Sequence, residues 1–464
     1  MLYIWKSIRY NKFMKTLLKQ VHTLVTCDDS DRILTGADVL LDGPAIAAIG
    51  YDLPSDADTV IDAGNLFVYP GLVNTHHHLY QYFTRSLPSV QGFELFDWLT
   101  ALYDIWKGLN ADTVYYSSLA GMGELMRYGC TTCFDHHYVF PAGADGLIDA
   151  QFSAAERLGM RMHASRGSMS LSKKDGGLPP DTVVQAVDPI LRDSARLIEA
   201  YHDPSRYSMR QMVLAPCSPF SVTAELLKES AVLARQYGVR LHTHLCETKD
   251  EERFTLEKTG MRPYAYMESL GWAGSDVFYA HGIHFNDEEL RALAATGTGV
   301  AHCPCSNMKL SSGVMRLPDM LELGVPVGLA VDGSASNDAS NLLEEIRTAY
   351  LLHRLTAGNR APTGYDLLRL ATRGSARLLG RSDIGQIAVG CAADLFAIRF
   401  DRMELLCADR DAANLFGTVG YHRPADYVFV NGSMTVRDGE LLTIDSERTH
   451  AAGAAEVRRL LEAL

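Results

Sequence analysis

Residues 70–81, PGLVNTHHHLYQ, close an apolar run with two histidines at positions 76 and 78. If the run is a strand, His76 and His78 lie two residues apart and point to the same face. Two imidazoles on one face can hold one divalent cation. A histidine-rich surface turn has the same spacing, so this segment predicts a metal site only if further ligands follow elsewhere in the chain.

Further candidate ligands do follow, each at the end of another apolar run. They are His244 in VRLHTHLCET, His281 in VFYAHGIHF and Asp332 in VGLAVDGSASN, with Glu247 three residues after His244. Imidazoles and one carboxylate are ordinary ligands for zinc or ferrous iron. Glu247 has a simpler interpretation, because an acid at the start of ETKDEER also favours a helix dipole. Its spacing from His244 within the larger set favours a catalytic role.

Other histidines have structural interpretations. His242 is expected to face away from His244, as a packed residue or a support for a ligand, and His77 and His284 are expected to be structural. Three more histidines are left open between lining a pocket and being satisfied polar groups, namely His136, His137 and His302.

The elements that must position these residues alternate short apolar strands with helical patterns, which is typical of βα units. Helical patterns such as TAELLKESAVLARQYG and DEELRALAATG separate most of the strands. The expected strands are residues 66–74, 130–135, 161–165, 212–215, 240–244, 277–281, 299–302 and 327–332. Eight such strands predict an α/β fold of the (β/α)₈ TIM-barrel type, whose chemistry lies at the carboxyl ends of the strands.

Both ends of the chain have a different residue pattern, in which apolar and polar residues alternate between turns rich in Gly, Pro and Asp. The expected organisation is a frayed extension at 1–13, half of a β-sandwich at 14–65, a barrel at 66–383, and the second sandwich half with a C-terminal helix at 384–464. The small domain is thus predicted to be discontinuous. The Gly/Pro-rich loop 172–181 is expected at the surface.

Composition narrows the class of protein. The 464 residues carry a net charge of −13 without a basic run, which argues against a nucleic-acid partner. No apolar stretch is long enough for a membrane span, and the first residues lack the continuous apolar core of a secretory signal. Nine dispersed cysteines suit a reducing cytoplasm. A small neutral or cationic substrate is expected.

The ligand pattern resembles the metal signature of the amidohydrolase superfamily, and the resemblance covers nearly the whole chain. It implies that His76, His78, His244 and Asp332 bind one metal and that His281 orients the nucleophile. VLAPCSP, on the fourth strand, contains no lysine. The two-metal members have a carboxylated lysine there, so its absence, together with Glu247, indicates the one-metal deaminase branch. Zn²⁺ is the expected metal, and Fe²⁺ would use the same ligands.

Within the superfamily the chain resembles the aminohydrolases that include guanine deaminase, triazine hydrolases and 8-oxoguanine deaminase. The segments NTHHHLYQ, FELFDWLTALYDIW, ASRGSMSLS and AHCPCSNMKLSSG are most similar to 8-oxoguanine deaminase. Guanine deaminase has an arginine after the fourth strand, where this chain has Cys217 and Ser218. Guanine is therefore not expected as the main substrate.

The resemblance implies hydrolytic deamination of an oxidised purine, 8-oxoguanine and water giving urate and ammonia, by attack of metal-bound hydroxide at C2. Glu247 would shuttle protons and Asp332 would take the proton of water. Gln81 is the first choice for a purine contact, since its amide both donates and accepts. Trp106 or Tyr103 could stack on the base, although aromatic residues at helical spacing more often belong to the core, and Arg166 could equally meet a carbonyl oxygen or form a surface ion pair.

Two alternatives stay open. The same fold can act on isoxanthopterin, guanine or a triazine that loses an amine or chloride, or it can be a non-catalytic scaffold, which usually lacks ligands. The barrel type is often a homo-oligomer.

Overall fold

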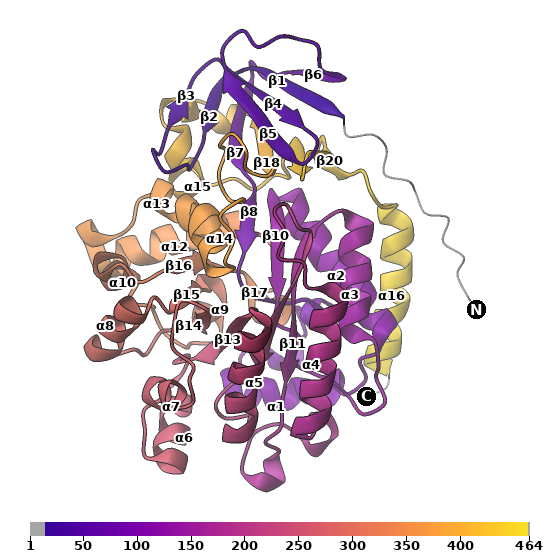
Figure 1. The fold of residues 1–464 in the computed structure, drawn as a ribbon, viewed down its shortest axis with the longest axis vertical. Coiled ribbons are helices and arrows are strands. Elements are labelled where there is room, and N and C mark those ends of the chain that lie inside the picture. Colours follow the sequence, from indigo (N-terminus) through magenta and orange to yellow (C-terminus); the bar gives the residue numbers. More distant parts are fainter. Residues whose placement is uncertain (1–13, 463–464) are drawn as a thin grey trace.

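Eight parallel strands form the centre of the molecule, as the computed structural model shows for residues 14–462 (Figure 1). The expected extension at 1–13 lies outside the described residues. In sheet order the strands are β8 (Leu72–Asn74), β10 (Cys130–Asp135), β11 (Arg161–Ser168), β12 (Arg210–Pro216), β13 (Arg240–Leu245), β14 (Val277–His281), β15 (Gly299–His302) and β16 (Val327–Leu329). The predicted TIM-type barrel is confirmed.

Helices surround the strands, and local sequence signals explain where they begin and end. The two helical patterns noted above become α5 and α8. Asn286 and Glu289 form a capping box at the start of α8, and Gly297 ends it at φ 71°. The helices are α1 (Leu95–Trp106), α2 (Ala111–Arg127), α3 (Leu147–Leu158), α4 (Val187–Tyr201), α5 (Ala224–Tyr237), α6 (Lys249–Thr259), α7 (Pro263–Ser269), α8 (Asp287–Thr296), α9 (Pro304–Lys309), α10 (Leu317–Leu323), α11 (Ser334–Asn337), α12 (Leu342–Ala357), α13 (Gly364–Arg369), α14 (Ser375–Leu378), α15 (Leu415–Thr418) and α16 (Ser446–Glu462).

The barrel has a seam between its first and last strands. β8 and β16 are the two ends of the eight-stranded sheet, and a separate parallel pair, β9 (His77–His78) with β17 (Asp332–Gly333), lies beyond them. The sequence predicted single strands at 66–74 and 327–332, and both are interrupted. At the first break, a Cβ on Gly71 would lie 2.2 Å from the Thr131 Oγ1, so the backbone approaches β10 more closely than any other residue allows.

The two ends of the chain combine into two further sheets, above the barrel in Figure 1. One has the order β5-β4-β1-β6, and the other has the order β21-β20-β19-β18-β7-β2-β3. Strand β18 runs antiparallel to β7, so residues more than 300 positions apart are neighbours. The strands are β1 (Lys15–Val21), β2 (Thr23–Val25), β3 (Ile33–Leu34), β4 (Ala37–Asp42), β5 (Ala45–Gly50), β6 (Thr59–Asp62), β7 (Leu66–Pro70), β18 (Leu395–Arg399), β19 (Tyr427–Val430), β20 (Ser433–Arg437) and β21 (Glu440–Leu441).

An apolar core joins these two sheets, and it includes Val39, Val68, Leu395 and Phe429. The last helix, α16, leaves this region and packs against α2 on the outside of the barrel (Figure 1). No helix within residues 14–462 is both long enough and apolar enough to cross a membrane.

Candidate metal centre

Three imidazole nitrogens and one carboxylate oxygen converge at the carboxyl ends of the barrel strands. The Nε2 atoms of His76 and His78 each lie 3.3 Å from Asp332 Oδ1, and the Nε2 atoms of His78 and His244 are 3.1 Å apart. All four side chains are buried. His76 and His78 follow β8, His244 lies on β13 and Asp332 begins β17, so the seam and the opposite wall both contribute.

The hydrogen bonds around two of these rings show where their protons are. The Nδ1 atoms of His78 and His244 each lie 2.6 Å from a backbone carbonyl oxygen, those of His136 and Cys217 respectively. A carbonyl only accepts, so Nδ1 carries the single proton of each neutral ring. Both Nε2 atoms therefore present lone pairs to one another, and their 3.1 Å contact is not a hydrogen bond.

The hydrogen bonds of His242 show where the proton of His76 lies. The Nδ1 of His242 donates to the Phe278 carbonyl at 2.9 Å, so its Nε2 accepts from His76 Nδ1 at 2.8 Å. His76 Nε2 is then left with a lone pair and has no hydrogen-bond partner within residues 14–462. The expectation that His242 faces away from His244 is wrong. Residues two apart on a strand share a face, and both point into the barrel.

Three lone pairs and a carboxylate around one point are the donor set of a divalent cation. Burial lowers the pKa of His76 to about 3 and that of His244 well below its ordinary value, which keeps both rings neutral. The hydrogen-bonded outer nitrogens hold the rings in a ligating orientation before any ion arrives. The residues therefore fit a divalent metal.

His281 and Glu247 lie beside this set. His281 Nε2 is 3.5 Å from Glu247 Oε2, and His281 Nδ1 is 2.9 Å from Asn307 Oδ1. The backbones of His281 and Asp332 adopt φ 72° and 63°, values that few residues other than glycine hold. Strain of this kind is concentrated at functional positions.

Glu247 is buried, and burial raises the pKa of its carboxyl to about 8, with the charge of Asp332 contributing further. The next turn of the chain fixes its backbone. Glu251 accepts the N–H groups of Cys246 and Glu247 at 2.9 and 3.0 Å. The backbone of Glu247 is thus held in place, and burial favours the neutral form of its carboxyl.

His136 belongs to the same group of histidines. A ring nitrogen of His136 lies among ligand-capable atoms of His76, His78 and His244, all within 4.8 Å of one another. Its Nε2 donates to the Ala215 carbonyl at 2.7 Å, and its Nδ1 has no partner in the described chain. The sequence left His136 open, although its position after β10 was the available signal.

A narrow pocket opens over the ligand set. Its polar lining includes Gln81, Glu247, His281 and Asp332, and its apolar lining comes from residues including Leu95, Trp98, Leu99 and Phe220. Both amide atoms of Gln81 are buried without a partner in residues 14–462. The amide rests on the backbone of Gly333, where a Cβ would lie 1.9 Å from Gln81 Oε1.

Two predicted substrate contacts lie elsewhere. Trp106 is fully buried, and its indole N–H donates to Thr84 Oγ1 at 3.1 Å. Arg166 donates to Asp193 at 2.7 Å and covers the ring of Phe140, so it serves the packing of α4. Among the aromatic residues of α1, the one that lines the pocket is Trp98.

Comparison with known proteins now identifies the family. Residues 67–439 match the model of the amidohydrolase family. The chain belongs to the amidohydrolase family. This amidohydrolase is 48% identical over 384 residues to 8-oxoguanine deaminase of Pseudomonas aeruginosa, covering 83% of this chain and 85% of that protein. It is 40% identical to hydroxydechloroatrazine ethylaminohydrolase of Pseudomonas sp. strain ADP, with 96% of each chain covered.

Among solved structures, the amidohydrolase resembles atrazine chlorohydrolase from Arthrobacter aurescens TC1 complexed with zinc. The TM-score is 0.92 at 35% identity, with 95% of this chain and all of that one covered. The chain is a hydrolase of the deaminase type within this family, with a cluster suited to a divalent metal.

Proposed function

We propose that this amidohydrolase is a cytoplasmic, one-metal aminohydrolase that converts 8-oxoguanine and water to urate and ammonia. The observation that carries the proposal is the set of inward lone pairs on His76, His78 and His244 facing Asp332, at a pocket that Gln81 and Glu247 also line. The 48% identity to an 8-oxoguanine deaminase supports this choice of substrate.

His76, His78, His244 and Asp332 would hold the metal, and we assign it as zinc, which the similar chlorohydrolase contains. A divalent metal there lowers the pKa of water to about 7 and so supplies a nucleophile at neutral pH. His281 Nδ1 is held by Asn307, which leaves Nε2 to accept a hydrogen bond from the attacking water. Asp332 would take the proton of that water.

Glu247 would carry the proton to the substrate. With its pKa raised to about 8, the carboxyl starts protonated and can protonate a ring nitrogen as the C2–O bond forms. The resulting carboxylate would then take the proton of the new C2 hydroxyl group and pass it to the amino group, so that C2=O forms, the C2–N bond breaks and ammonia leaves. Asp332 would return the proton of water to Glu247 at the end of the cycle. The proton transfer to the ring nitrogen and the proton transfer to the amino group would therefore both pass through Glu247, one after the other.

Gln81 would read the edge of the heterocycle. Its amide offers one acceptor and one donor pair, and the structure gives neither a partner in the described chain. Burial raises the pKa of the nearby Cys217 thiol to about 12, so that wall of the pocket stays neutral. A neutral, planar ring with adjacent C=O and N–H groups suits both the amide of Gln81 and the neutral wall at Cys217.

Entry of such a ring requires movement. The free volume between the lining side chains is about 20 Å³, smaller than a purine. Leu95, Trp98 and Leu99 on α1 and Phe220 contribute to the apolar lining. We propose that α1 shifts outward to admit substrate and closes over it, which also excludes water during the reaction.

A substrate panel tests the proposal. Metal-loaded protein is assayed with 8-oxoguanine, guanine, isoxanthopterin and a hydroxytriazine carrying an ethylamino group, with amine release as the readout. The triazine is included because the ethylaminohydrolase matches 96% of this chain. We expect kcat/KM to be largest for 8-oxoguanine. Strong turnover of the pterin or triazine with negligible turnover of 8-oxoguanine would overturn the substrate, while metal content near zero after reloading would favour a scaffold.

A further inference from the structure

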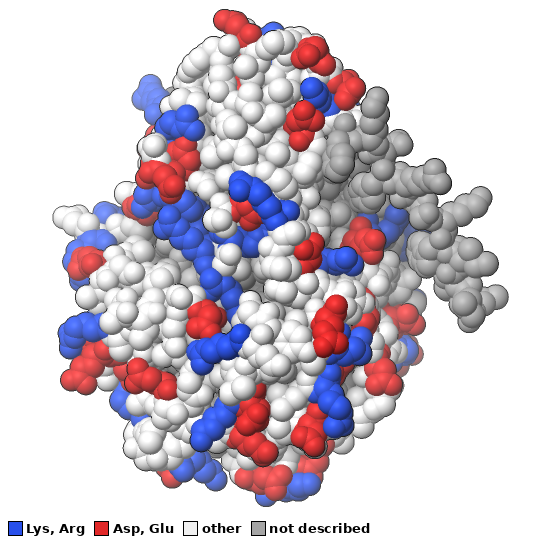
Figure 2. Space-filling model, in the orientation of Figure 1, with Lys and Arg blue, Asp and Glu red and all other residues white. Residues whose placement is uncertain are grey.

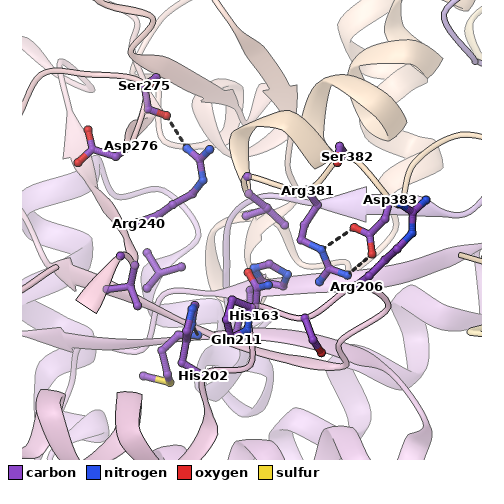
Figure 3. Close-up of a pocket in the computed structure, with 18 of the residues that line it drawn as sticks. His163, His202, Arg206, Gln211, Arg240, Ser275, Asp276, Arg381, Ser382 and Asp383 are labelled. Carbon is purple, nitrogen blue, oxygen red and sulfur yellow. Dashed lines mark hydrogen bonds and ion pairs between the residues drawn. The ribbon is translucent and has the colours of Figure 1, made fainter. Parts of the chain in front are cut away.

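A second cavity lies at the opposite end of the barrel from the metal ligands, where the strands begin. Arg240 is the first residue of β13, whereas His244 is near the end of the same strand. The cavity has a volume of about 600 Å³, within the usual range of about 300–1,000 Å³ for small-molecule sites. Its walls are the starts of β11, β12 and β13 and the segment after α14 (Figure 3).

The lining is rich in positive charge. Four arginines and two aspartates line the cavity, which gives a formal balance of +2. Both aspartates are already paired, Asp276 with Arg235 at 2.9 Å and Asp383 with Arg381 through two contacts of 2.8 Å. On this face of the molecule, Lys and Arg side chains gather where the upper domain meets the barrel, near α14 (Figure 2).

Two arginines are left without a carboxylate partner in residues 14–462, Arg240 and Arg206. The Arg240 guanidinium donates through Nη1 to the Ser275 carbonyl at 2.6 Å, its one side-chain hydrogen bond in the described chain. Arg206 donates to the Gly390 carbonyl and is exposed at the rim. Each planar fork thus retains N–H donors suited to an oxyanion.

His163 is the polar group at the back of the cavity. In Figure 3 its ring lies between Arg240 on one side and Arg381 with Arg206 on the other. The side chain is 1% exposed, and neither ring nitrogen has a hydrogen-bond partner within residues 14–462. A buried imidazole with both nitrogens unsatisfied is costly, and a ligand in the cavity would remove that cost.

The neighbouring groups keep His163 neutral. Burial lowers its pKa well below the ordinary value, and the positive charges of Arg381, Arg161 and Arg240 lower it further. A neutral ring still has one N–H to donate. His202 adds a second such donor, because its Nδ1 accepts the Met212 N–H at 3.2 Å and the proton of the neutral ring is therefore on Nε2.

We propose that this cavity binds a phosphate group, held by Arg240 and Arg206 with His163 as a buried hydrogen-bonding partner. A tetrahedral phosphate presents oxygens in several directions, and the cavity lining offers N–H donors of Arg240, Arg206 and His163. Inorganic phosphate and a small phosphate monoester share this chemistry, and the volume of the cavity leaves room for the organic part of an ester. The site is separate from the metal centre and does not depend on the proposed reaction.

Calorimetric titration of the metal-loaded protein at fixed ionic strength tests the proposal, with inorganic phosphate in one arm and ribose 5-phosphate in the other. We expect one saturable site per chain for at least one of them. Tighter binding of the sugar phosphate identifies an ester site, and equal or weaker binding identifies a site for free phosphate. Arg240→Gln should weaken binding by about tenfold or more, since an anion loses a charged donor.

Arg192→Gln is the matched control, because it removes the same charge from an exposed position on α4 outside the cavity. Arg206→Gln changes only the exposed rim, so it tests the site even if Arg240→Gln fails to fold, and it should weaken binding by a smaller factor. Absence of saturable binding in both arms would overturn the proposal. So would binding that is unchanged in Arg206→Gln and in folded Arg240→Gln, since that would place the anion at the metal.

Discussion

Two buried histidine pairs in this barrel have the same geometry and opposite chemistry. The Nε2 atoms of His78 and His244 are 3.1 Å apart, and so are the Nε2 atoms of His302 and His353. In the first pair both Nδ1 atoms donate to backbone carbonyls, so both facing nitrogens are unprotonated. In the second pair neither Nδ1 has a partner in the described chain, so one Nε2 can carry a proton and donate to the other.

The difference shows that the outer hydrogen bonds define a metal site as much as the short distance between ligands does. In a histidine pair with free outer nitrogens, one shared proton satisfies the two facing nitrogens. A pair whose outer nitrogens are occupied needs a cation at the centre. The predictions below test this contrast, from the largest expected effect to the smallest.

Removal of a ligand should have the largest effect. We expect His244→Ala to lose bound metal and more than about 10⁴-fold in kcat/KM, because the nucleophile depends on the ion. Elemental analysis and the deaminase assay measure both quantities. His353→Gln, in the other pair, should retain metal and activity. Full metal content in His244→Ala would remove His244 from the ligand set.

Removal of the proton carrier should separate metal binding from turnover. Glu247→Gln is expected to keep its metal and lose about 10²–10⁴-fold in kcat, the usual contribution of a general acid or base. Stopped-flow or steady-state ammonia release provides kcat, and metal analysis provides the control. Activity equal to the unmodified protein would exclude Glu247 from proton transfer.

Loss of an outer hydrogen bond should have an intermediate effect. His242→Phe deprives His76 Nδ1 of its acceptor, and we expect metal affinity to fall by about 10–100-fold. Competition with a chelator measures the affinity. The same measurement on His353→Gln should show no change, and an equal loss in both variants would mean that the effect is one of general destabilisation.

The His302–His353 pair should mainly affect how the free energy of unfolding depends on pH. Burial lowers the pKa of His353 from 6.5 to about 4, so the unfolded chain binds this proton more readily. The free energy of unfolding should therefore be highest above pH 6.5 and fall toward pH 4, by at most about 3 kcal/mol from this residue. Urea unfolding of His353→Gln should show a shallower fall, whereas His450→Gln, at an exposed histidine, should match the unmodified protein.

The sequence predicted the barrel and brought six site residues to one end of it because strand ends are visible as changes in pattern. His76, His78, His244, His281 and Asp332 each follow an apolar run, and parallel strands end at one edge. Glu247 was found through its spacing from His244. The distances and proton positions that turn these residues into a cation site come only from the folded chain.

Substrate contacts were harder to predict. Trp98 and Trp106 lie on the same helix, and only packing decides that Trp98 lines the pocket while Trp106 is bonded to Thr84. The contact of Arg166 also depends on packing, since its partner Asp193 lies on a helix 27 residues later. The hydrophobic period and the composition of a helix do not indicate which of its two similar faces contacts a ligand. Gln81 was predicted because it follows the histidines directly, and the structure places it in the lining of the pocket.

The position of the candidate metal centre at the barrel seam links metal binding to the stability of the barrel wall. His76 and His78 lie on one side of the junction between β8 and β16, and Asp332 lies on the other. A few hydrogen bonds, such as Thr75 N–H to the Leu329 carbonyl, and the short β9–β17 pair join the two sides. An ion held by these residues would cross-link the first strand of the barrel to the last. Release of the ion and opening of the barrel wall are then linked equilibria, so hydrogen exchange at the seam would report metal occupancy.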